Sequence, residues 1–171
     1  MRNVIAFVLL WLGLVLESSL FQVPPINVVQ PNLVLIVLIV VALTRGPRSA
    51  LVLGVLIGGL QDVDYGKFIG INAFTYAFVG YFAATVFSQF LQRNMAITLL
   101  VTVGFTFIQE WMTYGLTRLF DVTAFGLSTA MTKTLWQMLI NGVFLLVLYP
   151  LLSRLLTSKR LTYKDTEGSS L

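Results

Sequence analysis

Residues 50–70, ALVLGVLIGGLQDVDYGKFIG, combine an apolar run with a regular spacing of small residues. Ala50, Gly54 and Gly58 recur every four residues, and Asp62 continues that spacing. Residues four apart lie on one face of a helix, and small residues at this spacing let another helix approach closely within a membrane. The pattern therefore predicts a helix–helix contact with Asp62 at its end, within reach of the neighbouring helix. The alternative interpretation is a tight turn whose acidic residues simply face water.

A second set of small residues lies in the apolar segment 70–92, where they share one face and a bulky aromatic face lies beside them. Helices in lipid gain little hydrophobic energy from packing together, so small residues mark the faces that approach closely. This set therefore predicts packing and does not indicate a cofactor site. The candidates for helix packing or partner contact in the two segments are Gly54, Gly58, Gly59, Ala73, Ala77 and Gly80.

Composition places the chain among membrane proteins. Of its 171 residues, 57% are hydrophobic and only 11% are charged, whereas roughly a quarter are charged in soluble domains. A soluble fold of this size could not bury so much apolar surface. The predicted fold class is therefore all-α, a polytopic helical bundle in a membrane, and the length fits one compact domain.

The apolar segments predict six transmembrane helices. They are expected at residues 4–23, 31–44, 49–62, 70–92, 95–116 and 131–157, so that residues 1–157 form the membrane domain and residues 158–171 a polar tail. The second and third segments extend only about 21 Å, short of a ~30 Å hydrocarbon core. A re-entrant hairpin would place Arg45 and Arg48 inside the bilayer at high cost. We therefore expect two short spanning helices, with locally thinned lipid or with ends buried in protein.

The basic residues predict the orientation of the six spans. Eight of the eleven fall on the side that carries both termini, namely Arg2, Arg45, Arg48, Arg93, Arg154, Lys159, Arg160 and Lys164. Lys67, Arg118 and Lys133 fall on the other side. Cytoplasmic loops of membrane proteins carry such an excess of Lys and Arg, so both termini are expected in the cytoplasm.

This orientation places four polar side chains from different helices at a similar depth in the outer part of the membrane, namely Glu17, Asp62, Glu110 and Gln137. A carboxyl group within a span costs about 3 kcal/mol or more unless it is paired, hydrated or protonated. We expect one polar cluster, in which hydrogen bonds and Lys133 or Arg118 offset the desolvation of the carboxyl groups. For Glu17, a side chain that extends to the outer interface is the alternative.

Two further sets of polar residues recur at four-residue spacing. Thr98, Thr102 and Thr106 precede Glu110 in the fifth segment, and Asn141 lies on one face with Lys133 and Gln137 in the sixth. Threonine hydroxyls can bond back to their own helix, so this pattern alone assigns them no further role.

The sequence excludes most enzyme classes. It contains no Cys and no His, which removes thiol chemistry and the commonest general base. It also contains no Gly-rich phosphate loop, nucleophile elbow or zinc-binding helix motif, and its dispersed basic residues do not indicate nucleic-acid binding. No catalytic residue, cofactor or metal ligand is predicted. A scaffold that binds partner proteins and a small-molecule transport subunit remain.

Several short motifs, taken in order, resemble the MreD family of rod shape-determining proteins. They are Glu17-Ser18, Pro31-Asn32-Leu33, Gly58-Gly59-Leu60-Gln61-Asp62 with Gly70 after it, and Glu110. The glycine-to-aspartate segment is the most specific of these motifs. Family members typically carry a bulky residue where Gly59 stands.

The resemblance implies a non-enzymatic, multi-pass scaffold of the bacterial cytoplasmic membrane that maintains rod shape during cell-wall elongation. The partners implied are MreC first, then MreB, RodA and a class B penicillin-binding protein, with membrane lipid around the bundle and a homodimer as a further candidate assembly. The fold implied is similar to that of the S-components of energy-coupling-factor vitamin transporters, so a vitamin-binding subunit stays open as the alternative. S-components usually carry Ala-x-x-x-Ala in the first helix for docking, whereas Ala6 here is followed four residues later by Leu10.

Overall fold

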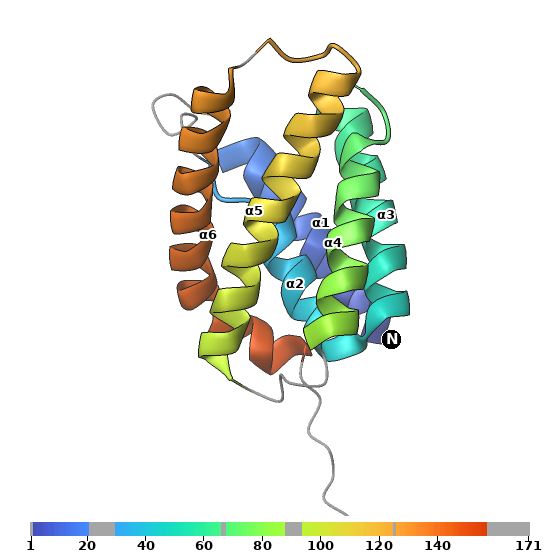
Figure 1. Ribbon diagram of the computed structural model, residues 1–171. Coiled ribbons are helices and arrows are strands. Elements are labelled where there is room, and N and C mark those ends of the chain that lie inside the picture. Colours follow the sequence, from blue (N-terminus) through green and yellow to red (C-terminus); the bar gives the residue numbers. More distant parts are fainter. Residues whose placement is uncertain (1, 21–29, 66–67, 88–93, 125, 157–171) are drawn as a thin grey trace, which may run out of the picture.

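The computed structural model describes residues 2–20, 30–65, 68–87, 94–124 and 126–156 (Figure 1). Within these residues the chain forms six α-helices and no strand, which confirms the predicted all-α class. The helices are α1 Arg2–Leu20, α2 Leu33–Arg45, α3 Pro47–Tyr65, α4 Ile71–Phe87, α5 Met95–Leu119 and α6 Leu127–Leu156. The predicted polar tail, residues 158–171, lies outside the described residues.

Successive helices run up and down the bundle (Figure 1). The N-terminus, the turn between α2 and α3 and the end of α6 lie at one end of the bundle. This end therefore carries Arg45 and Arg48, which flank that turn, and Arg154, which lies in the last turn of α6. The end of α3, the start of α4, the end of α5 and the start of α6 lie at the opposite end.

Helix α2 forms the centre of the bundle. It contacts all five other helices, and every residue from Leu33 to Ala42 is buried. A helix that is apolar on all sides is stable only when it is buried on all sides, and the sequence LVLIVLIVVA meets that condition. With 13 residues, α2 extends only about 20 Å. Other helices of the protein thus enclose this short helix. This agrees with the explanation that the ends of a short helix are buried in protein, which was one of the two offered for its length.

The helix ends depart from the predicted ones where a side chain or a proline sets the boundary. Helix α2 begins at Leu33, after Pro31, because the Asn32 side chain accepts a hydrogen bond from the Leu35 N–H and caps the first turn. Helix α3 begins at Pro47, since proline suits a first helical turn. Helix α6 begins at Leu127, four residues before the predicted start.

The outer surface of the bundle is apolar. Large hydrophobic side chains are exposed on α1, α3, α4, α5 and α6, among them Val4, Val52, Phe74, Leu100 and Val147. Helices α5 and α6 are long and apolar enough to cross a membrane by length and composition, and Asn3–Ser19, Leu33–Arg45 and Ile71–Phe87 are shorter apolar helices. Soluble monomers rarely expose so much contiguous apolar surface, so this surface fits insertion into a membrane.

Candidate functional site

Helices α3 and α4 pack with their backbones almost in contact. A β-carbon on Gly58 would lie 2.5 Å from the carbonyl oxygen of Asn72 and 2.6 Å from the Cα of Ala73. A β-carbon on Gly54 would lie 2.7 Å from the carbonyl oxygen of Tyr76. Real side chains do not approach this closely, so only glycine fits at these two positions on α3.

The same contact continues toward the start of α3, where a β-carbon on Gly80 would lie 3.0 Å from the carbonyl oxygen of Ala50. Residue numbers rise along α3 while they fall along α4, so the two helices are antiparallel. We call this line of contacts the α3–α4 seam, and it consists of Ala50, Gly54, Gly58, Ala73, Ala77 and Gly80. Gly59 lies outside the seam, because a β-carbon there would have no neighbour within 4 Å.

Asp62 closes the seam at the start of α4. Its carboxylate accepts hydrogen bonds from the backbone N–H groups of Gly70 at 2.9 Å, Asn72 at 3.0 Å and Ala73 at 3.0 Å. Only 1% of the residue is exposed. The first N–H groups of a helix lack partners within the helix, and a negative charge there is favourable. Asp62 therefore caps α4 from the neighbouring helix and does not face water, whereas Asp64 is exposed.

A network of buried polar groups surrounds the start of α2. The side-chain oxygen of Asn141 accepts hydrogen bonds from the Asn32 N–H at 2.8 Å and from Gln137 Nε2 at 3.3 Å. The Asn141 amide donates to the Thr106 hydroxyl at 3.1 Å, and Gln137 also donates to the Gln30 carbonyl at 2.7 Å. Helices α5 and α6 thereby hold the segment that leads into α2.

Helices α1 and α4 contribute to the same place. Glu17 Oε1 accepts a hydrogen bond from the Val34 N–H at 3.3 Å, and the Tyr76 hydroxyl donates to Asn32 Oδ1 at 3.2 Å. We call this set the α2-start network, and its side chains are Glu17, Asn32, Tyr76, Thr106, Gln137 and Asn141. It joins α1, α4, α5 and α6 around the one helix that all of them cover.

Glu110 makes a different contact, on the side of the bundle where α5 meets α6. Lys133 Nζ lies 3.3 Å from Glu110 Oε2, with 65% of the lysine side chain and 13% of the glutamate side chain exposed. The pair borders a cavity of about 790 Å³, whose walls include Trp111, Tyr114 and Trp136. Glu110 follows Thr106 by four residues on α5, and Lys133 precedes Gln137 by four residues on α6. The pair therefore lies one helical turn from the α2-start network, without a hydrogen bond to it among the described contacts.

The four predicted polar residues therefore lie in three places. Glu17 and Gln137 each hydrogen-bond near the start of α2 but not to each other among the described contacts, Glu110 pairs with Lys133 beside that network, and Asp62 caps α4. Sequence reasoning did not select Asn32, Tyr76, Thr106 and Asn141 as site residues, although the four-residue spacing of Gln137 and Asn141 was a signal. Among the described residues, no group of three or more His, Cys, Asp or Glu side chains could hold a metal ion.

Comparison with known protein families gives a match over most of the chain. A family model described as rod shape-determining protein MreD matches residues 1–159 of the chain. No curated protein and no solved structure matches it. The expected likeness to the S-component fold therefore has no support from a solved structure.

Proposed function

The chain belongs to the MreD family of rod shape-determining proteins, and from this premise we propose that it is a multi-pass membrane scaffold of the cell-wall elongation machinery. Membership in the family gives the chain a role in rod shape determination as a structural protein. The proposal adds that six helices cross the membrane, that both termini are cytoplasmic, and that the chain acts by holding MreC and peptidoglycan synthases.

Two features of the bundle support the proposed topology. The outer faces of the helices expose large apolar side chains, and basic residues at the ends of α2 and α6 and at the start of α3 lie at the same end as the N-terminus. Positive charge is favoured on the cytoplasmic side. Short α2 needs no thinned lipid in this topology, since other helices cover it.

The observation that carries the scaffold proposal is the α2-start network. The side chains of Asn141, Gln137 and Asn32 form hydrogen bonds with one another and with the backbone around the start of α2. A network whose members are satisfied internally specifies one arrangement of the helices. It therefore suits a rigid platform better than a binding site, in which polar groups would point into a cavity.

We propose the exposed face of α3 around Gly59 as a partner interface. Gly59 leaves an open notch on this face, and exposed Val55, Leu60 and Val63 surround it in the sequence of the helix. Small residues allow a partner helix to approach closely in lipid. Since Gly54 and Gly58 are used within the chain, Gly59 is the glycine on α3 that remains for a partner helix, such as the membrane anchor of MreC.

A vitamin-binding subunit is the second candidate, and the cavity beside Glu110 and Lys133 is the observation that favours it. The packing of the first helix argues against a vitamin-binding subunit. Ala6 and Leu10, at the positions of the docking motif of S-components, are both fully buried in the core. That face of α1 is therefore covered by the chain itself and could not dock an energising module.

Co-purification tests the proposal. A tagged copy is extracted in mild detergent from cells that depend on it for rod shape, and the bound proteins are identified. We expect MreC and peptidoglycan synthases to co-purify with the wild-type chain and to be lost with Gly59→Leu while the variant stays folded. Recovery of a transporter ATPase module with a bound vitamin would contradict the scaffold proposal.

A further inference from the structure

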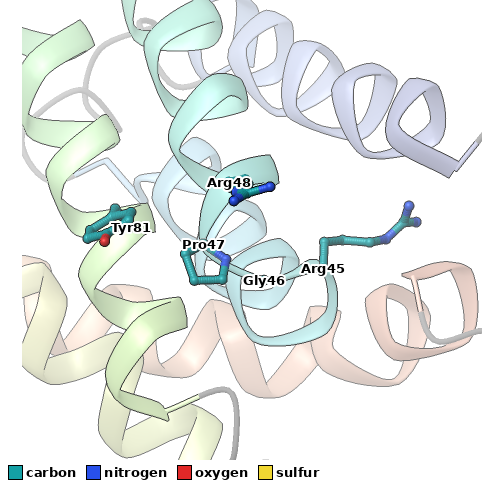
Figure 2. A pocket seen from close by; sticks show the side chains of 5 residues that line it. All are labelled: Arg45, Gly46, Pro47, Arg48 and Tyr81. Carbon is teal, nitrogen blue, oxygen red and sulfur yellow. The ribbon is translucent and has the colours of Figure 1, made fainter.

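A small pocket opens at the end of the bundle where the basic residues gather. It has a volume of about 380 Å³ and is lined by Arg45, Gly46, Pro47, Arg48 and Tyr81. In Figure 2 the three polar side chains fan out around the turn between α2 and α3. Tyr81 of α4 lies on one side, Arg45 at the end of α2 on the other, and Arg48 between them.

The turn holds the two arginines in place. Gly46 has a φ of 86°, a left-handed conformation that strongly favours glycine, and its N–H donates to the Ala42 carbonyl at 3.2 Å. Helix α3 then begins at once with Pro47. Because buried residues of α2 and the seam of α3 anchor both sides of the turn, Arg45 and Arg48 stay at the rim of one pocket.

The charges around this pocket favour an anion. None of the acidic residues that the structure describes lines it. Arg48 lies in the first turn of α3, where the helix dipole is unfavourable for a cation and favourable for an anion. The Arg48 guanidinium can bind phosphate oxygens through paired hydrogen bonds, and the Tyr81 hydroxyl offers a further donor. The Arg45 side chain is directed away from Tyr81 and adds positive charge at the edge of the pocket (Figure 2). The pocket thus suits a phosphate group.

The surface next to the pocket is apolar. Leu51 and Val52 follow Arg48 at spacings of three and four residues, which places them on the same face of α3, and both are exposed. On α4, Phe74 precedes Tyr81 by seven residues and is also exposed. A cationic pocket at the end of an apolar face matches a molecule with a charged head and apolar chains.

We propose that this pocket binds the phosphate of an anionic phospholipid, whose acyl chains lie against the exposed face of α3 and α4. Basic pockets between transmembrane helices on the cytoplasmic side bind such head groups in other membrane proteins. The assignment to the cytoplasmic leaflet rests on the orientation proposed above. The lipid would fix the depth of the α2–α3 turn in the membrane and so stabilise the seam.

The test uses the full chain purified in detergent, with thermal unfolding measured as phosphatidylglycerol or phosphatidylcholine is added. Phosphatidylglycerol should raise the unfolding midpoint and phosphatidylcholine should not. Arg48→Gln should lower the apparent affinity for phosphatidylglycerol, read from the lipid concentration needed to raise the midpoint, roughly fivefold. That change corresponds to about 1 kcal/mol for one basic residue. Tyr81→Phe should lower this affinity less. Arg154→Gln, at the same end of the bundle but outside the pocket, is the matched control and should leave the response unchanged.

Equal stabilisation by the two lipids, or an equal loss in the Arg48 and Arg154 variants, would overturn the proposal. Stabilisation by inorganic phosphate alone to the same extent would show a site for a free anion and would also overturn it. The orientation is tested separately by labelling a cysteine at position 64 in intact cells. Protection of that position would contradict the proposed orientation without changing the lipid selectivity of the purified chain, so the two failures can be told apart.

Discussion

Gly58 of α3 lies so close to Ala73 of α4 that a β-carbon on the glycine would be 2.6 Å from the Cα of the alanine. Backbone atoms of two helices therefore face each other without a side chain between them. Such an approach brings main-chain dipoles and Cα–H groups into contact and makes van der Waals packing dense, which is how helices associate in lipid. It also makes the α3–α4 seam sensitive to a single methyl group.

We expect Gly58→Ala to destabilise the protein by about 3 kcal/mol or more, at the upper end of the usual cost of overpacking. The added carbon would meet backbone atoms, which cannot rotate out of the way as a flexible side chain can. Thermal unfolding of the detergent-purified variant measures the effect. Gly54→Ala should be nearly as severe and Gly80→Ala milder, in the order of the distances that their β-carbons would have.

The adjacent glycine is the matched control. Gly59→Ala adds the same methyl group one residue later, where nothing lies within 4 Å. It should leave stability unchanged or raise it by up to about 1 kcal/mol, since alanine favours a helix over glycine. Equal losses in the Gly58 and Gly59 variants would show that the seam does not pack as described.

Asp62→Ala should lower stability by about 2 kcal/mol or more, because three N–H groups at the start of α4 would lose a charged acceptor. The stability of Asp62→Asn should fall between that of Asp62→Ala and that of the wild type, since the asparagine amide keeps one acceptor oxygen. Asp64→Asn is the control on the exposed side of the same helix end and should change stability by less than about 0.5 kcal/mol. Thermal unfolding compares the three variants, and an equal response of positions 62 and 64 would contradict the capping role.

The α3–α4 seam and the Asp62 cap are the parts of the candidate site that could be predicted from the sequence. The seam could be predicted because close approach requires only small residues at the spacing of a helical face, and both sets of small residues are visible in the sequence. The position of Asp62 at the end of the seam followed from the same spacing. The α2-start network could not be predicted in the same way, since its central hydrogen bond joins Asn32 to Asn141, residues 109 positions apart. No local pattern specifies which polar side chains meet across the bundle.

Asn141→Leu should cost about 2–3 kcal/mol, because it keeps the volume roughly constant and leaves the partly buried Asn32 N–H and the Gln137 amide without their common acceptor. We also expect the unfolding transition to broaden, since α5 and α6 would no longer be tied to the start of α2. Thr132→Val on the exposed side of α6 removes a hydroxyl that bonds only within its own helix. It serves as the control and should have little effect. A stability of Asn141→Leu equal to that of the control would show that the network is not structural.

The proposed topology predicts which positions are reachable from outside the cell. The chain contains no cysteine, so single cysteines report without background. Asp64→Cys should react with an impermeant thiol reagent in intact cells, whereas Asn94→Cys and Ser49→Cys should react only after the membrane is opened. Positions 64 and 94 are both exposed in the fold, so a difference between them reflects the side of the membrane. Labelling at position 94 with protection at position 64 would show the opposite orientation in the membrane. Labelling at both positions would contradict the six-span topology.

Glu110 provides the prediction that separates a scaffold from a ligand-binding subunit. Its carboxylate pairs with a lysine that is 65% exposed, so the pair contributes little to stability by itself. In a scaffold, Glu110→Gln keeps the shape and a hydrogen bond to Lys133, and it should change unfolding by less than about 1 kcal/mol and leave partner co-purification intact. Glu110→Leu removes the partner of Lys133 and should weaken assembly.

In a ligand-binding subunit the same residue would line the binding cavity of about 790 Å³. Either substitution would then lower ligand affinity without loosening the fold. The measurement is thermal unfolding of the wild type and both variants with and without candidate vitamins, alongside co-purification of MreC. Because the glutamine variant preserves shape but not charge, a vitamin that stabilises the wild type and fails to stabilise Glu110→Gln would assign the cavity to a ligand. The alternative outcome is that no candidate vitamin changes the unfolding midpoint and that MreC is lost only from Glu110→Leu. That outcome would assign the Glu110 region to assembly.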